Sequence, residues 1–290
     1  LRDINDMFAG TGLGKETYRA RQIMKCLYQQ GTTSVDQMRT LSREFREELS
    51  RRVVIDSPRI VKTQTSKDAT KKVLFELKGG NFVESILIPG KTHWTVCVST
   101  QVGCRMGCRF CLTGKQGLTR NLLPSEIVGQ VTALRTEMPE GPDIKNIVLM
   151  GMGEPLDNYD NVVKAIRILT SDHAFGFSTR KVTLSTCGLA PMILKLGEDV
   201  CVNIAVSLNA PEDTLRSDLM PINRKHPLAE LLAACRDYPM PERRMVTFEY
   251  ILIGGVNDSL EDAAKLVRLL KGTRCKLNLI AFNEFPDSPF

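Results

Sequence analysis

Short apolar runs alternate with amphipathic stretches along the chain from residue 94 onward. Apolar runs predict six strands near 94–102, 146–151, 181–186, 201–208, 246–253 and 276–282. Between them, apolar residues at three- and four-residue spacing predict helices near 125–136, 158–170, 189–197, 227–237 and 259–271. Repeated strand–helix steps imply a parallel sheet with right-handed crossovers, so the sequence predicts an α/β fold, closed or partly closed as a barrel.

The residues before this alternation follow two other patterns. Helical spacing from about Thr17 to Gln30 and from Ser42 to Arg52 predicts a small helical unit over residues 1–55. Residues 56–92 are expected to form a β extension, with strands at 72–78 and 82–88 joined by the turn Gly79-Gly80-Asn81. Residues 93–290 then form the barrel.

Glu84 lies in the second strand of this hairpin and shares a face with Phe82, Ile86 and Ile88, because side chains alternate along a strand. A carboxylate among three apolar neighbours is expected to be partly desolvated. Glu84 is therefore a candidate general base. An exposed glutamate on an edge strand is an equally good interpretation of the same pattern.

Positive charge is concentrated in the first quarter of the chain. Residues 1–72 hold 15 Lys and Arg against 9 Asp and Glu, while the remaining residues hold 24 of each. A basic unit attached to a neutral body fits a polyanionic substrate that is bound through its phosphates. An ordinary solvated helix face would give the same count. No apolar run approaches the length of a membrane span, and we expect the protein to carry no export signal.

The strongest chemical signal is the loop Cys104-Arg105-Met106-Gly107-Cys108-Arg109-Phe110-Cys111. Three thiols follow a predicted strand, one fewer than a closed structural zinc or iron–sulfur site takes. They can hold three irons of a four-iron cluster and leave the fourth iron open for a small molecule. A zinc knuckle completed by a distant residue and three unrelated buried cysteines are the alternatives. The spacing resembles the cluster motif of the radical S-adenosylmethionine (SAM) superfamily.

Barrels of this kind carry their chemistry on loops at the carboxyl ends of the strands. Small or polar residues follow each predicted strand there, so six strand ends are expected to converge on one mouth. They are the cysteine loop, Gly151 to Pro155, Ser185, Ser207-Leu208-Asn209, Gly254 to Asn257, and Asn283.

Longer matches narrow the resemblance to one family. The runs Cys97 to Cys104, Thr113 to Gly117, Met150 to Leu156 and Tyr18 to Ile23 resemble the dual-specificity adenine-C2 methyltransferases of 23S ribosomal RNA and transfer RNA. With shorter matches at Leu184 to Thr186, Val206 to Leu208, Val256 to Asp258 and Asn278 to Ile280, they cover nearly the whole chain. The resemblance implies a partial TIM-like (β/α)6 radical SAM barrel behind the N-terminal helical domain and the hairpin extension.

The resemblance also implies a set of ligands. A 4Fe-4S cluster is expected on Cys104, Cys108 and Cys111, with SAM on the open iron. SAM contacts are expected from Gly153, Glu154, Ser185, Ser207, Leu208, Asn209 and Asn283. Glu154 could accept from the amino group of SAM, and Gly153 permits a close approach of the backbone. Asn209 stands where the family usually has histidine.

In this family one SAM methylates a cysteine of the enzyme, and a second is cleaved to a deoxyadenosyl radical that activates the methylcysteine. The resulting carbon radical adds to adenine C2, a base removes the C2 proton, and a second cysteine releases the RNA through a disulfide. Glu84 and Cys97 match the family positions of the base and the resolving thiol. The methyl-carrying cysteine of the family lies in a C-terminal segment beyond the stretch Phe282 to Pro286. We expect this segment to be absent from the given sequence. Without that cysteine, the 290 residues are not expected to complete methyl transfer to RNA.

The implied partners are 23S rRNA, tRNA and an electron donor such as flavodoxin or ferredoxin. The protein is expected to be a cytoplasmic monomer with no membrane contact. Two rival functions remain at this stage: a related adenine-C8 rRNA methyltransferase, and a non-catalytic RNA-binding protein with a structural metal. The run Gly114-Lys115-Gln116-Gly117 favours the C2 type.

Overall fold

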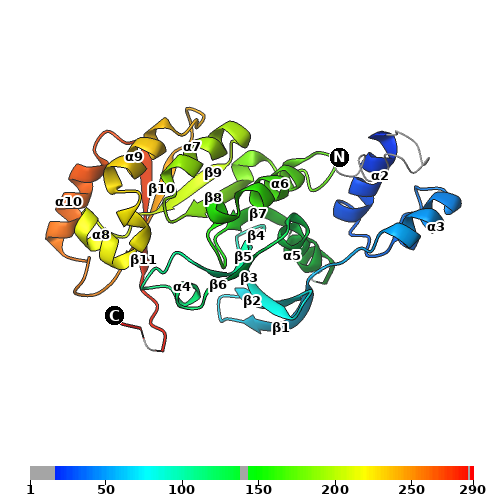
Figure 1. Ribbon diagram of the computed structural model, residues 1–290, viewed down its shortest axis with the longest axis horizontal. Helices are drawn as coiled ribbons and strands as arrows, with labels where there is room; N and C mark the ends of the chain where they lie inside the picture. Colours follow the sequence, from blue (N-terminus) through cyan, green and yellow to red (C-terminus); the bar gives the residue numbers. More distant parts are fainter. Residues whose placement is uncertain (1–16, 138–142, 287) are drawn as a thin grey trace.

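A computed structural model describes residues 17–137, 143–286 and 288–290; residues 1–16 of the expected N-terminal domain lie outside the described residues. A sheet of nine strands, in the order β1-β2-β3-β4-β7-β8-β9-β10-β11, organises the molecule (Figure 1). From β4 to β11 every neighbouring pair is parallel, which confirms the six-strand barrel. The barrel is open, because β1 and β11 are the two edges of one continuous sheet.

The barrel strands and their helices lie close to the predicted positions. The strands are β4 (Trp94–Cys97), β7 (Ile144–Leu149), β8 (Val182–Thr186), β9 (Asn203–Ser207), β10 (Val246–Leu252) and β11 (Cys275–Ala281). The helices are α5 (Pro124–Glu137), α6 (Tyr159–Thr170), α7 (Ala190–Asp199), α9 (Leu228–Asp237) and α10 (Leu260–Leu270). Short additions to this repeat are α4 (Leu112–Lys115), α8 (Asp213–Leu219), η2 (Pro155–Asn158), η3 (Thr179–Lys181) and η4 (Pro221–Arg224).

The main core lies between the sheet and the helices outside it. Alternate apolar side chains of β4, β7, β8, β9 and β10 point outward and pack against α5, α6, α7 and α9. They include Val96, Val98, Ile147, Leu149, Val182, Leu184, Ile204, Val206 and Phe248. The opposite face of the sheet, which forms the barrel interior, carries Thr183, Ser185, Ser207 and other polar residues of the parallel strands, and these are only half-buried.

The predicted hairpin adds to the barrel sheet rather than standing apart from it. β2 (Lys71–Leu77) pairs antiparallel with β3 (Asn81–Pro89), and β3 pairs antiparallel with β4. Gly79 and Gly80 adopt left-handed φ values of 91° and 75° in the turn. A further strand, β1 (Arg59–Thr65), pairs with β2.

One predicted strand is divided in the structure. Residues 94–102 form β4 and then, after a break, the start of β5 (Gln101–Cys104). β5 leaves the main sheet and pairs antiparallel with β6 (Gly117–Asn121) in a small separate ribbon. The cysteine loop therefore follows β5 of this ribbon and does not follow the first barrel strand directly.

The N-terminal unit has an apolar cluster of its own. It consists of α2 (Thr17–Tyr28), η1 (Val35–Gln37) and α3 (Arg43–Arg52), with Ser42 capping α3 through Phe45 N. The Tyr28 ring lies 5.1 Å from the Phe175 ring, and Gln29 Nε2 donates to Asp172 O at 2.8 Å. These contacts fix the unit beside the loop that follows α6. No helix among the described residues is long and apolar enough to cross a membrane.

Candidate active site

The three predicted iron ligands meet on one loop. Cys104 ends β5, and Cys108 and Cys111 follow before α4, with Cys111 N donating to Cys108 O at 3.1 Å. Each thiol lies within electrostatic range of the other two. Gly103 has a φ of 75°, and a Cβ there would lie 1.8 Å from Gly117 O, so only glycine allows β5 and β6 to approach.

Burial makes the ligand thiols hard to ionise without metal. It raises the pKa of Cys104 to about 11 and that of Cys108 to about 12, and neighbouring negative groups add to the effect. A metal bound by these thiols would therefore have to displace their protons, as metal binding to thiols generally does.

The loop thiols do not form a compact site for a single ion in this structure. Within the described ranges, no three His, Cys, Asp or Glu side chains converge tightly enough to hold one metal ion. A four-iron cluster requires a wider arrangement, because each thiolate binds a different iron. All nine cysteines are free, so the three thiols are available and no disulfide is found in the structure.

Two neighbouring elements brace the loop. Arg105 Nε lies 2.9 Å from Asp157 Oδ2 in the loop after β7. On the other side, Arg109 N donates to Leu219 O at 3.0 Å, and the Arg109 guanidinium forms an ion pair with Asp218. The cysteine loop is thereby connected to η2, which follows β7, and to α8, which follows β9.

Gly153 and Glu154 follow β7 and lie against β5. Gly153 has a φ of 103°, and a Cβ on it would lie 2.6 Å from the Cβ of Gln101. Gln101 is fully buried; its Oε1 accepts from Glu154 N at 2.8 Å and its Nε2 donates to Asp157 Oδ2 at 2.8 Å. Gln101 thus fixes the glycine–glutamate loop beside the ribbon that carries the cysteines.

The Glu154 carboxylate is buried and already hydrogen-bonded. Its Oε2 accepts from Cys187 N at 2.7 Å and its Oε1 from Leu156 N at 3.0 Å. Burial raises the pKa of Glu154, and these hydrogen bonds oppose the shift. The side chains of Cys187 and Thr186 also donate to this carboxylate. A carboxylate has about four acceptor sites, so an ammonium group would bind there by displacing one of these donors.

The other expected SAM contacts come from the strand ends. Ser185 and Ser207 are half-buried on the interior face of β8 and β9, and Leu208 is fully buried after β9. Asn283 is exposed after β11. Their arrangement agrees with a mouth at the carboxyl ends of the strands, but their contacts with SAM stay a prediction.

Asn209 has a structural role that the sequence does not reveal. It adopts a left-handed φ of 57°, a conformation that asparagine tolerates better than most residues. Its Oδ1 accepts from Ile251 N at 2.8 Å, and its Nδ2 donates to Met220 Sδ at 3.3 Å. The buried amide is therefore occupied by the fold, which weakens the expectation of a side-chain contact with SAM.

Glu84 and Cys97 lie on the same face of the sheet. Ile86 is directly opposite Cys97 in the β3–β4 register, and Glu84 follows Ile86 at the period of two. Cys97 is buried, which raises the pKa of its thiol to about 11. The structure thus places both residues on the interior face of the barrel.

The expected desolvation of Glu84 is wrong. Its side chain is 42% exposed, and its Oε1 lies 3.2 Å from Lys72 Nζ. Phe82 and Ile88, which share its face, are also exposed, and Ile86 is half-buried, so no part of the described chain fully covers these three apolar neighbours. Glu84 remains accessible to a substrate, but as a solvated carboxylate.

Sequence reasoning missed Gln101 and Arg216, and it gave Cys187 no role. Cys187 lies after β8, where its amide donates to Glu154 and its thiol is within electrostatic range of Cys104 and Cys108. A glutamine just before the cysteine loop was a usable signal for Gln101. Arg216 had none, since an arginine in a short polar segment usually lies on a solvated face.

Comparisons with known proteins agree with this geometry. The profile of the radical SAM superfamily matches residues 98–267, and that of the ribosomal RNA large subunit methyltransferase N-terminal domain matches residues 2–55. The dual-specificity RNA methyltransferase RlmN of Syntrophus aciditrophicus is 65% identical over 280 residues, which are 97% of this chain and 80% of the relative. That of Geobacter sulfurreducens is 53% identical over 96% of this chain and 76% of its own length.

A solved structure extends the agreement to three dimensions. A radical SAM methyltransferase from Sphaerobacter thermophilus superposes with a TM-score of 0.91 at 44% identity, covering 99% of this chain and 84% of that protein. The match includes both the N-terminal unit and the barrel. On the sequence identity, the two matching profiles and this superposition, the chain belongs to the RlmN family of radical SAM methyltransferases.

Proposed function

We propose that this protein methylates C2 of adenine in 23S rRNA and tRNA, using SAM and a 4Fe-4S cluster held by Cys104, Cys108 and Cys111. The observation that carries the proposal is three free thiols on one loop beside Gly153 and Glu154, in a chain 65% identical to a dual-specificity RNA methyltransferase. Adenine C2 is a poor nucleophile, so methyl transfer by simple displacement would fail there. SAM and the cluster, when bound, supply the one-electron chemistry that this carbon requires.

The residues around the cysteine loop would hold and orient SAM. Glu154 would accept from its ammonium group in place of one of the donors that it now has, and Ser185 and Ser207 offer hydroxyl groups on the interior face. Gly153 leaves room for a close approach of the backbone. An external one-electron donor of the flavodoxin or ferredoxin type would deliver the electron.

Glu84 and Cys97 would act on the RNA. The C2 hydrogen of adenine must leave as a proton when a methyl group replaces it. Glu84 is half-exposed on the interior face and can take that proton, while Cys97, on the same face, is the thiol proposed to release the RNA. A thiol with a pKa near 11 is almost wholly protonated at neutral pH, so Cys97 needs a proton acceptor before it can react.

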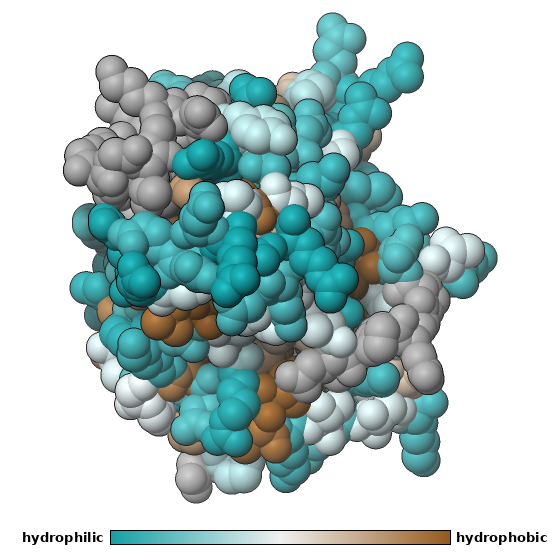
Figure 2. Space-filling model, turned by 90° about the vertical axis from the view of Figure 1, so that its right-hand side faces the viewer, coloured by the Kyte–Doolittle hydropathy of each residue, from teal (hydrophilic) through white to brown (hydrophobic). Residues whose placement is uncertain are grey.

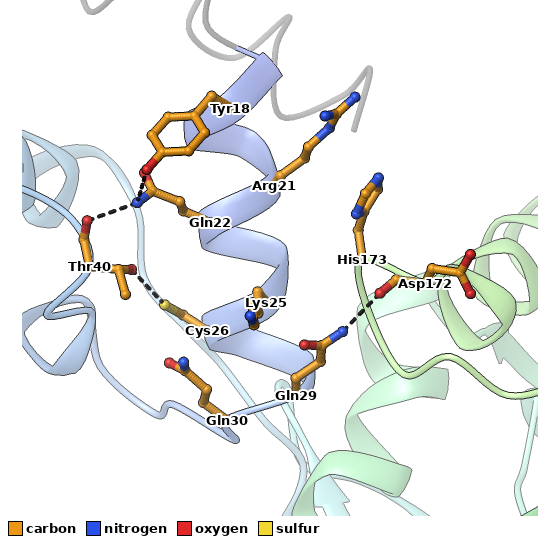
Figure 3. Close-up of a pocket in the computed structure, with 10 residues that line it drawn as sticks. All are labelled: Tyr18, Arg21, Gln22, Lys25, Cys26, Gln29, Gln30, Thr40, Asp172 and His173. Carbon is orange, nitrogen blue, oxygen red and sulfur yellow. Dashed lines mark hydrogen bonds between the residues drawn. The ribbon is translucent and has the colours of Figure 1, made fainter.

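The N-terminal unit would bind RNA phosphates. A pocket of about 440 Å³ lies between α2 and the loop at Asp172 and His173 (Figure 3). Arg21 and Lys25 are one turn apart on the exposed face of α2, and neither has an ion-pair partner among the described residues. The Asp172 carboxylate points away from α2, and its backbone oxygen accepts from Gln29. Figure 2 shows that the surrounding face of the molecule is mostly hydrophilic.

The salt dependence of RNA affinity tests this surface. Replacing Arg21 and Lys25 together by glutamine should flatten the slope of log K against log salt by about 1.4 to 1.8, if each cation neutralises one phosphate. The control variant replaces Arg236 and Lys271 by glutamine, which removes the same charge at the opposite end of the molecule (Figure 1). Equal slopes in the two double variants would show that Arg21 and Lys25 on α2 do not contact RNA phosphates.

Mass spectrometry tests the methylation itself. Expressing a form of this protein that carries the methyl-bearing cysteine of the family, in a bacterium that lacks 2-methyladenosine, should restore that nucleoside in both rRNA and tRNA. The variant Glu84→Gln should fail to restore it, whereas Lys72→Gln, which removes only the neighbouring ammonium, should retain most activity. Methyl groups found at C8, or none in the presence of a loaded cluster, would refute the proposal.

A further inference from the structure

Arg216 is a buried cation without a buried carboxylate partner. Its side chain is 0% exposed, and every nitrogen of the guanidinium donates to a neutral acceptor. Nε donates to Leu208 O at 3.1 Å, Nη1 to Asn223 Oδ1 at 2.8 Å, and Nη2 to Cys187 O and Ser207 O at 2.8 and 2.9 Å. No described carboxylate forms an ion pair with it. Such a charge is costly unless something nearby offsets it.

The guanidinium lies behind the mouth of the barrel. Its acceptors belong to the ends of β8 and β9 and to η4, so one side chain ties three separate segments together. Gly188 leaves room for it, because a Cβ there would lie 3.2 Å from Nη2 and 3.0 Å from Leu231. Gly188 also has a left-handed φ of 110°.

The helix that carries Arg216 also holds the cysteine loop. At the end of α8, Leu219 O accepts from Arg109 N, and Asp218 pairs with the Arg109 guanidinium. On the inner side, the charge of Arg216 is within electrostatic range of the Cys108 thiol. α8 therefore contacts both the cysteine loop and the ends of β8 and β9. In the proposed function these strand ends surround SAM.

We propose that Arg216 is a positioning residue for the cluster site and the fixed positive charge that offsets its negative charge. The inference rests on the proposed function, since it takes the three loop thiolates as iron ligands. Those thiolates bring three negative charges to the site when the metal binds, and the nearby Glu154 is buried as well.

A fixed cation near a cluster has a measurable effect on its potential. Reduction adds one negative charge to the cluster, and a nearby positive charge favours that state because opposite charges attract more strongly where water is excluded. Net charge around a cluster is one of the factors that set its potential. Arg216 should therefore raise the midpoint potential and make the cluster easier to reduce.

The test is an anaerobic redox titration of the reconstituted protein, followed by electron paramagnetic resonance without SAM or RNA. Arg216→Met should shift the midpoint potential to a more negative value, and Arg216→Lys should leave it close to that of the parent. Arg224→Met is the control, because Arg224 is exposed on η4 and its charge is screened by water. Iron and sulfide per chain are measured in every sample.

The outcomes separate charge from packing. An Arg216→Met protein with a full cluster and the parent potential would show that Arg216 only supports the fold, and would overturn the proposal. If Arg216→Met does not fold, Arg216→Lys decides: a negative shift despite the retained charge refutes charge compensation, and a parent-like potential supports it. A parent protein that binds no cluster would overturn the proposed function together with this inference.

Discussion

Gln130 on α5 connects the hairpin extension to the barrel through buried hydrogen bonds. It is fully buried, and its Oε1 accepts from Ser85 Oγ at 2.7 Å and from Ser99 N at 2.9 Å. Its Nε2 donates to Ser99 O at 3.0 Å and to Glu126 O at 3.2 Å. Ser99 in turn donates from Oγ to Glu84 O at 2.6 Å. One amide thus supports the backbone that positions the proposed base.

Replacing Gln130 by leucine keeps the size of the side chain and removes all four hydrogen bonds. The Ser85 hydroxyl and both backbone groups of Ser99 are then left without this partner in a buried site. At about 1 to 2 kcal/mol for each stranded group, the free energy of unfolding should fall by about 3 to 6 kcal/mol. The extra apolar surface that leucine buries would offset about 1 kcal/mol of this fall in the free energy of unfolding.

Urea denaturation of the cluster-free protein measures the loss. Thr132→Val on the same helix is the control, because Thr132 Oγ1 donates only to Val128 O within α5 and its removal should cost little. A Gln130→Leu protein destabilised by less than about 1 kcal/mol would contradict the reasoning, since the stranded groups would then have found other partners.

Three further predictions concern the site itself. Cys108→Ala should lower the bound iron from about four per chain to below one, measured after anaerobic reconstitution. An iron content close to that of the parent would show that Cys108 is not a ligand. Gly153→Ala forces a Cβ against Gln101 at a φ of 103°, so SAM affinity should fall while the far N-terminal unit stays folded, as calorimetry and circular dichroism would report. Burial raises the pKa of Cys97 from 9.0 to about 11, so its protonated form stabilises the fold below pH 9. Between pH 9 and pH 11 the free energy of unfolding of the parent should fall by about 2 to 3 kcal/mol relative to that of Cys97→Ala. Parallel curves of stability against pH for the two proteins would contradict this.

The barrel was predictable because β4, β7, β8, β9 and β10 are buried on the outer face and an amphipathic helix separates each of them from the next barrel strand. Such strands require short apolar runs in the sequence, and such helices require apolar residues at three- and four-residue spacing. β1 was missed because nearly all its residues are exposed, which leaves no alternation to detect. β6 is short and has no buried residue, and α8 is too short for a helical period.

The site was predictable to the extent that its residues are neighbours in the sequence. Three cysteines within eight residues are a local pattern, and so is Gly153-Glu154-Pro155. Arg216 depends on acceptors that come together only in the fold, so no local pattern indicates it. The exposure of Glu84 could not be read from its apolar neighbours, since whether a strand face is covered is decided by the other strands of the barrel.

The position of Glu84 depends on the register of β3 against β4, which the parallel barrel alone does not set. Side chains alternate along a strand, so a slip of one residue would turn Ser85 toward the interior and Glu84 toward α5. Two features prevent the slip: Val83 and Leu87 are buried in the core between sheet and helices, and Ser85 bonds to Gln130. The packing of α5 against the extension therefore selects the face on which the carboxylate emerges. Any substitution that weakens this packing should reduce proton removal at C2 before it reduces iron binding, because the cysteine loop is braced separately by α8 and the loop after β7.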